Sequence, residues 1–488
     1  GAAARPATER SVVKGGVKRF VRQQVPSEIL EDKALNAAAS VLPSNYSFEI
    51  HKTVWRVRQA GARRVALQFP EGLLLYACTI ADILQAFAGA ERVFVLGDVA
   101  YGACCVDDFT AAALGADLLV HYGHSCLVPV DVTGVPCMYV FVDIQFDVSH
   151  LVEAARTNFE PDARLVLAGT VQFASMMQKA RDALAPTMPN LRVPQCKPLS
   201  PGEVLGCTAP VVDAADAILF VADGRFHLEA IMIANPDIPA YRYDPYGKTL
   251  TRERYDHVGM RAARRAAVET AMHASRFGVV LGTLGRQGSP ATLQHVEAQL
   301  RRNGREYTVV LMSEIHAHRL LAMSDVQAWV QIACPRLSID WGEGFEGTPL
   351  LTPYELGVAM GEVPPFWSDA ADDGAKASKG SGAAAGASEG GVVHPSPSAR
   401  SKHAGDAQAS AAHGGCDACG GGNAGGCGGT AAAEGAGAGC RDAETSFGPR
   451  YPMDYYDAAG GAWNGTYRRA KPKKPRRPAQ PPVVAGAS

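Results

Sequence analysis

The 488-residue sequence lacks an excess of charge of either sign, since 47 Lys and Arg face 49 Asp and Glu, giving a formal net charge of -2. This balance argues against a protein that coats nucleic acid over its whole surface, so we expect no direct DNA binding. The sequence also has no charge-free run of 18 apolar residues, because its most apolar stretch, Gly72–Gly89, is interrupted by Asp82. We therefore expect neither a membrane span nor a membrane partner.

Cysteine is scarce as well. Twelve cysteines in 488 residues are too few for a disulfide scaffold. The first residues contain no apolar core of the kind that a secretory signal needs. We therefore expect a reducing compartment, in which clustered thiols are either metal ligands or bystanders.

The two ends of the sequence differ in composition from its middle. Residues 1–44 form a basic arm and lead-in, with Glu9 as the one acid among the first 25 residues. This arm is either mobile or a transit peptide. Residues 371–440 contain 19 Gly and 20 Ala. Such a segment buries too little apolar surface to offset its ordering entropy, so we expect residues 368–488 to be a disordered insert and tail.

The tail carries two further patterns. Arg468–Arg477 is basic and rich in proline, which is typical of a solvated tail, of an RNA contact or of a nuclear import signal. Four cysteines with metal-site spacing stand among Gly and Ala, and they are either an accessory metal site or unligated. These four are Cys416, Cys419, Cys427 and Cys440.

The middle of the chain alternates short apolar runs with helical patterns, which predicts an α/β fold with parallel sheets flanked by helices. The pattern recurs about every 100 residues and predicts three similar domains, at 45–150, 151–255 and 256–367, around a shared central site. The expected strands are Val65–Phe69, Val93–Leu96, Leu118–Tyr122, Met138–Val142, Leu165–Ala168, Ile218–Val221, Ala240–Tyr243, Val279–Gly282, Thr308–Met312 and Val326–Ile332.

Three cysteines follow expected strands, one in each repeat. Cys104 and Cys334 come after strands of the first and third repeats, and we place Cys207 past the second strand of the second repeat. Ligands of parallel α/β sheets bind beyond the carboxyl ends of the strands, so three thiolates meeting there would suit an iron–sulfur cluster or zinc. Spacing alone leaves the alternative open that they are buried, unligated cysteines.

Several long motifs resemble one family, the diphthamide-biosynthesis enzymes or 2-(3-amino-3-carboxypropyl)histidine synthases. The resemblance is to the eukaryotic subunit 1 type, and it covers about residues 26–367 and the motif at 451–456. The motifs are GDVAYGACCVDDFTAAALGADLLVHYGHSCLVPVD (97–131), VPQCKPLSPGEVLGC (193–207), LGTLGRQGS (281–289), ACPRLSIDWG (333–342), PSEILEDKALNAAASVLPSNYSFEIHKTVWRVR (26–58) and YPMDYY (451–456).

The resemblance implies that three α/β domains each supply one cysteine to a central [4Fe–4S] cluster. The G-A-C, L-G-C and A-C-P motifs of the family fall on Cys104, Cys207 and Cys334. Cys105 is the alternative to Cys104. We prefer Cys104, since relatives with a single cysteine at this point read G-A-C-D.

The implied reaction cleaves S-adenosylmethionine at the cluster and transfers a 3-amino-3-carboxypropyl group to C2 of a histidine in translation elongation factor 2. The resemblance also implies a heterodimer with diphthamide synthase subunit 2, a small iron-binding electron donor protein and a cytoplasmic location. One alternative is a non-catalytic scaffold subunit that presents elongation factor 2. A zinc-dependent α/β hydrolase or transferase is a weaker alternative, because no His/Asp metal motif or G-x-S-x-G turn is present.

The Gly-rich loop Gly282–Ser289 follows an expected strand, and Ser289 and Pro290 look like an N-cap and a first helical residue. An arginine beside such a helix start pairs well with a carboxylate. Arg286 is therefore predicted to hold the methionine carboxylate of S-adenosylmethionine. The alternative is a tight turn with a solvated arginine.

Other polar residues stand near the motif cysteines. His121 and His124 either line the site or bond to the backbone. Asp107 and Asp108 are expected to cap the helix after Cys104, with a catalytic role as the alternative. The remaining cysteines of the body are expected to pack rather than to bind metal. These are Cys78, Cys126, Cys137 and Cys196.

Overall fold

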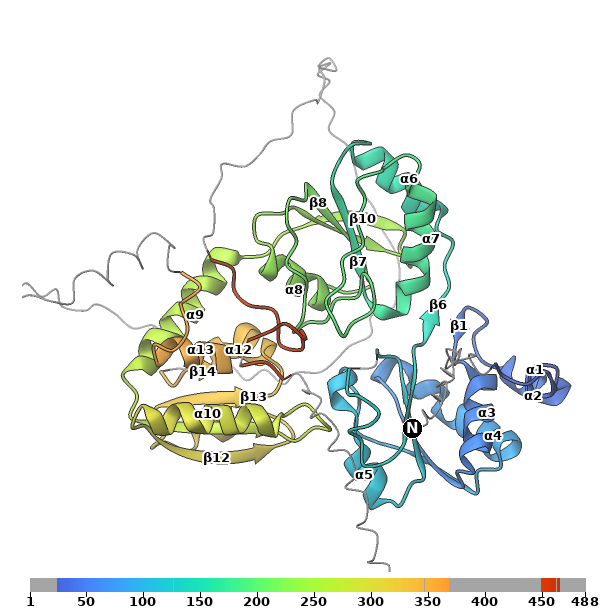
Figure 1. The fold of residues 1–488 in the computed structure, drawn as a ribbon, viewed down its shortest axis with the longest axis horizontal. Coiled ribbons are helices and arrows are strands. Elements are labelled where there is room, and N and C mark those ends of the chain that lie inside the picture. Colours follow the sequence, from blue (N-terminus) through green and yellow to red (C-terminus); the bar gives the residue numbers. More distant parts are fainter. Residues whose placement is uncertain (1–23, 126, 346, 368–448, 462, 466–488) are drawn as a thin grey trace, which may run out of the picture. The chain divides into compact units, whose positions relative to one another are not determined.

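The structure, a computed structural model, describes residues 24–125, 127–345, 347–367, 449–461 and 463–465 (Figure 1). All of them belong to one compact unit, Gly1–Asp369 together with Phe447–Ser488. Residues 1–23 of the expected arm, the Gly/Ala-rich insert with its four cysteines and the basic tail lie outside the described residues. The expectation of disorder was wrong for residues 449–461 and 463–465, because Tyr451, Met453, Tyr455 and Tyr456 are buried.

Three four-stranded sheets confirm the expected α/β class. The first sheet has the order β3-β2-β4-β5, and all its strands are parallel. Its apolar strands form because branched and aromatic side chains fit a pleated surface that helices cover on both faces. The strands are β2 (Arg64–Gln68), β3 (Arg92–Val95), β4 (Leu118–Tyr122) and β5 (Cys137–Val140), with helices α3 (Ile50–Ala60), α4 (Ala77–Ala88) and α5 (Asp108–Ala113).

The second sheet has the order β10-β9-β8-β7, in which only β10 runs antiparallel. Beyond β7, Arg192 and Glu203 form isolated parallel bridges to Val166 and Gly169. The strands are β7 (Leu165–Gly169), β8 (Ala217–Val221), β9 (Ala240–Asp244) and β10 (Thr249–Glu253), with helices α6 (Ser149–Asn158), α7 (Ala174–Leu184) and α8 (Phe226–Ala234).

The third sheet has the parallel order β12-β11-β13-β14. Its strands are β11 (Arg276–Gly282), β12 (Glu306–Met312), β13 (Ala328–Ile332) and β14 (Leu350–Leu351). Its helices are α9 (His257–Met272), α10 (Pro290–Arg302), α11 (Ala317–Leu321), α12 (Arg336–Trp341) and α13 (Pro353–Ala359).

The strand order supports the repeat. The first sheet (β3-β2-β4-β5) and the third sheet (β12-β11-β13-β14) have the same arrangement. In each, the strand that comes second along the chain lies at one edge, and the strands that come first, third and fourth follow across the sheet. The bridge at Arg192 occupies the same edge of the second sheet, where a full second strand is missing. The domain boundaries proposed from the sequence stay a prediction.

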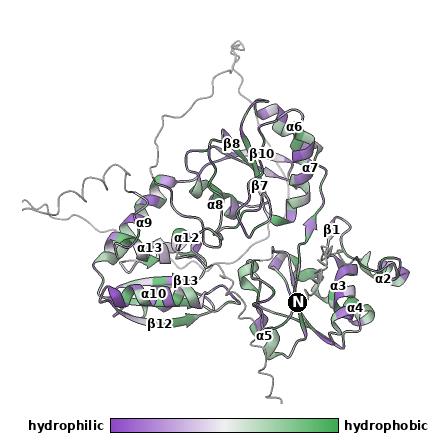
Figure 2. Ribbon diagram, in the orientation of Figure 1, coloured by the Kyte–Doolittle hydropathy of each residue, from purple (hydrophilic) through white to green (hydrophobic). Residues whose placement is uncertain are grey.

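The core lies between these sheets and their helices. Strands β4, β7, β8 and β13 are buried at every residue. Helices such as α9 and α10 carry both hydrophilic and hydrophobic residues along their length, as Figure 2 shows. Their apolar faces therefore cover the sheets, and their polar faces remain toward solvent.

One helical stretch in the described residues, Glu71–Ala88, is long and apolar enough to cross a membrane by length and composition alone. A core helix passes the same test. Here a 3₁₀ turn, Glu71–Tyr76, leads into α4, and Ile80 and Leu84 of that helix are buried in the core around the first sheet. Our expectation that no membrane is involved stays a prediction.

Candidate metal centre

The three motif cysteines come together in one apolar cluster, although they belong to three different repeats. Cys207 is buried in this cluster, and Cys104 and Cys334 pack against it. Cys104 lies in a short 3₁₀ turn, Ala103–Cys105, after β3. Cys334 lies between β13 and α12. Parallel strands end at a common edge of each sheet, and here those edges bring the thiols together.

Our placement of Cys207 past a second strand was wrong. Cys207 precedes β8, and the chain before it pairs with β7 in isolated bridges at Arg192 and Glu203. Pro194, Pro198 and Pro201 lie in that chain. Proline has no N–H to give to a ladder, so this segment forms no continuous strand.

The surroundings of the thiols favour their neutral form. The Cys105 Sγ 3.9 Å away, burial, and the nearby Cys207 and Cys334 thiols all raise the pKa of Cys104. Burial and the Cys334 thiol raise that of Cys207. Burial raises the pKa of Cys334 to about 11. The three thiols meet at one apolar cluster, and a bound cation would offset the cost of their ionisation there.

The contacts also distinguish Cys104 from its neighbour. Cys104 interacts with Cys105, Cys207 and Cys334, and it packs against the apolar cluster. Hydrogen bonding to Cys104 lowers the pKa of Cys105. The position of Cys104 therefore fits the preferred assignment.

The chemistry of the donor set suits an iron–sulfur cluster or zinc. Among the residues that the structure describes, no group of three His, Cys, Asp or Glu is arranged to hold one metal ion. Three thiols are soft donors, which select iron–sulfur clusters or zinc. A cluster of four irons is larger than one ion, so its three ligands need not approach one another as closely. The residues present therefore fit a [4Fe–4S] group.

A buried polar network holds the turn that carries Cys104. The Gln68 side chain donates to the Cys105 carbonyl (2.8 Å) and accepts from the Asp107 N–H (3.1 Å). His121 Nδ1 lies 2.9 Å from the Gln68 side-chain oxygen. Gln68 is the last residue of β2, and His121 is the last but one of the neighbouring strand β4, so the sheet itself fixes this turn.

Three polar residues have clear partners. Asp107 caps α5 as expected, accepting from the Thr110 N–H at 2.9 Å. His124 bonds the Ala100 carbonyl at 3.1 Å, so its contact is to the backbone. Ser289 caps α10, and Pro290 is its first residue, as expected.

Arg286 pairs with Asp108 in this structure, contrary to a solvated turn arginine. Its Nε lies 2.8 Å from Asp108 Oδ1, and its Nη2 lies 2.6 Å from Oδ2. The guanidinium also lies over the Phe109 ring, 4.4 Å from its centroid. Its expected role toward S-adenosylmethionine stays a prediction.

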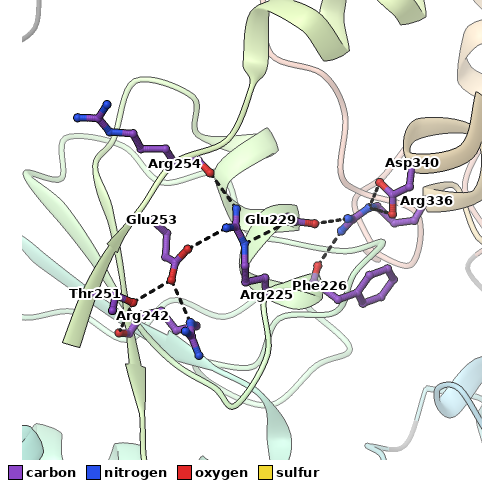
Figure 3. A network of polar contacts seen from close by, with 9 residues as sticks. All are labelled: Arg225, Phe226, Glu229, Arg242, Thr251, Glu253, Arg254, Arg336 and Asp340. Atoms are coloured by element: carbon purple, nitrogen blue, oxygen red, sulfur yellow. Dashed lines mark hydrogen bonds and ion pairs between the residues drawn. The ribbon is translucent and has the colours of Figure 1, made fainter. Parts of the chain in front are cut away.

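A second arginine lies beside Cys334. Arg336 is almost fully buried and donates to Glu229 (2.6 Å), to the Phe226 carbonyl (2.6 Å) and to Asp340 (2.9 Å). Figure 3 shows that this network continues from Glu229 through Arg225 to Glu253 and β10. The loop of Cys334 is therefore tied to helix α8 of the second sheet.

The other cysteines of the body are placed differently. Cys196 is buried and donates to Asp457 at 3.1 Å. Cys137 is half-buried, as expected for packing. Cys78 is exposed, so the expectation that it packs was wrong, because it lies on the outer face of α4. Cys126 lies outside the described residues.

Sequence reasoning did not assign four residues to the site. Gln68 ends an apolar strand, and a polar residue at that position is the signal that was available. Glu203 is buried beside Ser125. Tyr455 and Tyr456 pack in the cysteine cluster, although their motif had already been noticed.

Three repeated α/β sheets around a set of convergent thiols define a class of protein, a three-domain α/β protein with one shared thiol site. Comparison with known proteins identifies the family. The family described as "Putative diphthamide synthesis protein" matches residues 69–370, and the chain belongs to it.

The similar proteins agree with this family. The chain is 58% identical to 2-(3-amino-3-carboxypropyl)histidine synthase subunit 1 of Gallus gallus over 351 residues, 72% of this chain and 85% of that protein. It is 57% identical to the Homo sapiens protein of the same name, over 70% of this chain and 78% of that one. The crystal structure of Dph2 from Pyrococcus horikoshii with a 4Fe-4S cluster is 27% identical, with a TM-score of 0.56, over 65% of this chain and 92% of that one.

Proposed function

We propose that this chain holds a [4Fe–4S] cluster through Cys104, Cys207 and Cys334 and uses it in the first step of diphthamide synthesis. The observation that carries the proposal is that three thiols, one from each repeat, meet at one apolar cluster, with Cys207 buried and Cys104 and Cys334 half-buried. The similarity to a protein solved with a 4Fe-4S cluster supports it. The chain is a subunit of a transferase, as the names of its relatives state.

The proposed reaction transfers the 3-amino-3-carboxypropyl group of S-adenosylmethionine to C2 of a histidine in translation elongation factor 2. A bound cluster would supply one electron to the sulfonium, which breaks its bond to the methionine γ-carbon. The chain's own residues hold the cluster with three thiolates, which leaves a fourth iron for the substrate. The apolar side chains around them, including Leu127 and Leu199, keep water from the site.

The names of the relatives, which contain "subunit 1", indicate an assembly of several subunits. We propose that the partner is diphthamide synthase subunit 2 and that a small iron-binding protein delivers the electron. A cytoplasmic location belongs to the same proposal, since the substrate is a translation factor. Direct binding of the methionine carboxylate by Arg286 stays the prediction made from the sequence, and it is the alternative to the pairing of Arg286 with Asp108.

Iron content tests the proposal. The full chain, purified without oxygen together with its partner subunit, should hold about four irons and release 5′-methylthioadenosine on reduction with S-adenosylmethionine. Cys334→Ala and Cys104→Ala should reduce the iron to near zero, because each removes one of three ligands. Cys105→Ala is the matched control and should keep the cluster.

Three results would count against the assignment. A Cys334→Ala chain with its full iron would show that this thiol is no ligand. Loss of iron in Cys105→Ala but not in Cys104→Ala would exchange the two assignments. An iron-free chain in an active complex would favour the scaffold role.

A further inference from the structure

The Gly-rich loop after β11 packs directly on the turn that carries Cys104. Gly285 has a φ of +53°, and a Cβ at this position would collide with the backbone of Cys105 and lie 2.7 Å from the Val106 carbonyl oxygen. Only glycine allows this approach of two backbones. The third sheet therefore contacts the first sheet at the cysteine turn.

An ion pair with a defined geometry stands beside this contact. Arg286 meets both oxygens of Asp108, whose side chain is fully buried, while that of Arg286 is 15% exposed. Arg286 also donates to the Val132 carbonyl at 3.2 Å, and Asp108 accepts from the Gly134 N–H at 2.5 Å. A two-point arginine–carboxylate pair fixes orientation as well as distance, which one lysine contact does not.

The start of the same loop packs against the residue before Cys334. Gly282 ends β11, and Ala333 follows the neighbouring strand β13. A Cβ at Gly282 would lie 2.8 Å from the Ala333 Cβ. The loop of Arg286 and the loop of Cys334 are thus packed side by side at one edge of the third sheet.

We propose that Gly285, Arg286 and Asp108 form a latch that sets the position of the Cys104 turn relative to Cys334. The Gln68–His121 network holds the turn from the first sheet, and the latch holds it from the third. Arg286 is then a positioning residue, which acts on the cluster through Asp108 and the turn. The inference rests on the proposed function in one respect, that Cys104 and Cys334 share a cluster.

Hydrogen exchange in the full chain before cluster assembly tests the latch without the cofactor. Asp108→Asn and Arg286→Lys should each raise amide exchange in residues 102–106 by at least about tenfold, because each breaks the two-point pair. The double variant should exchange no faster than the faster single variant, since both remove one interaction. Gly285→Ala should have the same effect through the backbone collision.

A matched control lies at the other end of the same strand. Arg276 begins β11 and forms exposed ion pairs with Glu306 and Asp325 at 3.0 and 2.8 Å. Arg276→Lys should leave exchange at residues 102–106 unchanged. Unchanged exchange in Asp108→Asn, Arg286→Lys and Gly285→Ala would overturn the latch.

Binding of S-adenosylmethionine to the reconstituted complex separates the two roles of Arg286. A latch requires that Asp108→Asn and Arg286→Lys lower the iron content together and weaken binding to the same extent. If Arg286→Lys alone weakened binding and Asp108→Asn kept both iron and affinity, direct carboxylate binding would replace the latch. A wild-type chain without iron would instead refute the proposed function, and the exchange result would still decide the latch.

Discussion

At the scale of single residues, the site places several ionisable groups where burial disfavours their charged forms. Three thiols share one apolar cluster, and burial raises the pKa of Cys207 and Cys334. Unligated thiols in such surroundings stay protonated, so cluster assembly has to release protons. The sequence could locate these residues through their motifs, but Cys104 and Cys105 are adjacent and alike in pattern, and the choice of Cys104 as the ligand stays a prediction.

Glu203 is another buried group beside the site. Its side chain is 1% exposed, and burial raises its pKa, while the Ser200 N–H donates to Oε2 at 3.0 Å. Among the described residues its Oε1 has no hydrogen-bond partner. Because the pKa of Glu203 is higher in the folded chain than in the unfolded chain, its protonated form contributes to stability. This contribution is complete below the ordinary glutamate pKa and is lost as pH rises through the pKa of Glu203 in the folded chain.

Glu203→Gln should therefore stabilise the chain by about 1–2 kcal/mol at pH 7, because it removes the cost of a buried charge and can keep the bond from Ser200. Denaturant unfolding from pH 4 to pH 8 would measure this. The stability gap between the variant and the wild type should widen as pH rises. Glu314→Gln, at an exposed position, is the control and should change little. A gap that is constant with pH would refute the argument.

At the scale of elements, sequence periodicity was sufficient for the buried strands. All ten expected strands exist, because uninterrupted apolar runs such as Ile218–Val221 leave few alternatives. Periodicity did not predict β10, because the sequence Thr249–Glu253 is mostly exposed and polar. It also did not predict the two-residue strands β1 (Tyr46–Ser47), β6 (Asp143–Ile144) and β14. Such elements form because of their neighbours rather than their own pattern.

Helix α13 shows how one element connects distant parts. Thr352 caps it, and Glu355 completes a capping box by accepting from the Thr352 N–H at 2.8 Å. Glu355 also binds Arg264 of α9 through two bonds of 2.7 Å and accepts from the Tyr451 hydroxyl at 2.9 Å. One buried carboxylate therefore joins two helices and the segment that follows the insert.

Glu355→Ala should destabilise the chain by about 3–5 kcal/mol, because it leaves the buried Arg264 charge without its partner. Thr352→Ala should cost only about 1 kcal/mol, the usual loss for one cap. Glu269→Ala removes an exposed pair with Arg265 on the same α9 and should change stability by less than about 1 kcal/mol. Urea unfolding of the three variants gives the ranking, and equal losses for Glu355→Ala and Glu269→Ala would contradict it.

At the scale of the whole molecule, the site needs a segment far away in the sequence. The Tyr455 N–H donates to the Cys207 carbonyl at 3.2 Å, and the Tyr456 N–H donates to the Thr208 hydroxyl at 2.9 Å. The Ala209 N–H donates to the Met453 carbonyl at 2.9 Å. Periodicity carries no information on such contacts, because about 250 residues separate the partners. The motif at 451–456 was visible in the sequence, but its place beside Cys207 was not.

The two ends of the segment between Phe366 and Pro449 are close together. One guanidinium, that of Arg261, donates to the Phe366 carbonyl and to the Pro449 carbonyl. The rings of Phe366 and Tyr451 are 5.0 Å apart between centroids. A segment whose ends are held in this way can be shortened at little cost, since loop-closure entropy changes slowly with length.

Replacing residues 370–446 by a Gly/Ser linker of about 20 residues should therefore leave the melting temperature and the iron content nearly unchanged, because such a linker easily spans neighbouring ends. A chain that stops at residue 369 should lose iron and stability, because Tyr455 and Tyr456 no longer cover the cysteine cluster. Iron and zinc analysis together with thermal unfolding distinguishes the linker variant from the chain that stops at residue 369. If the shortened chain bound less metal than the wild type, Cys416, Cys419, Cys427 and Cys440 would have to contribute a second metal site, and the cysteine cluster would not be the whole metal centre.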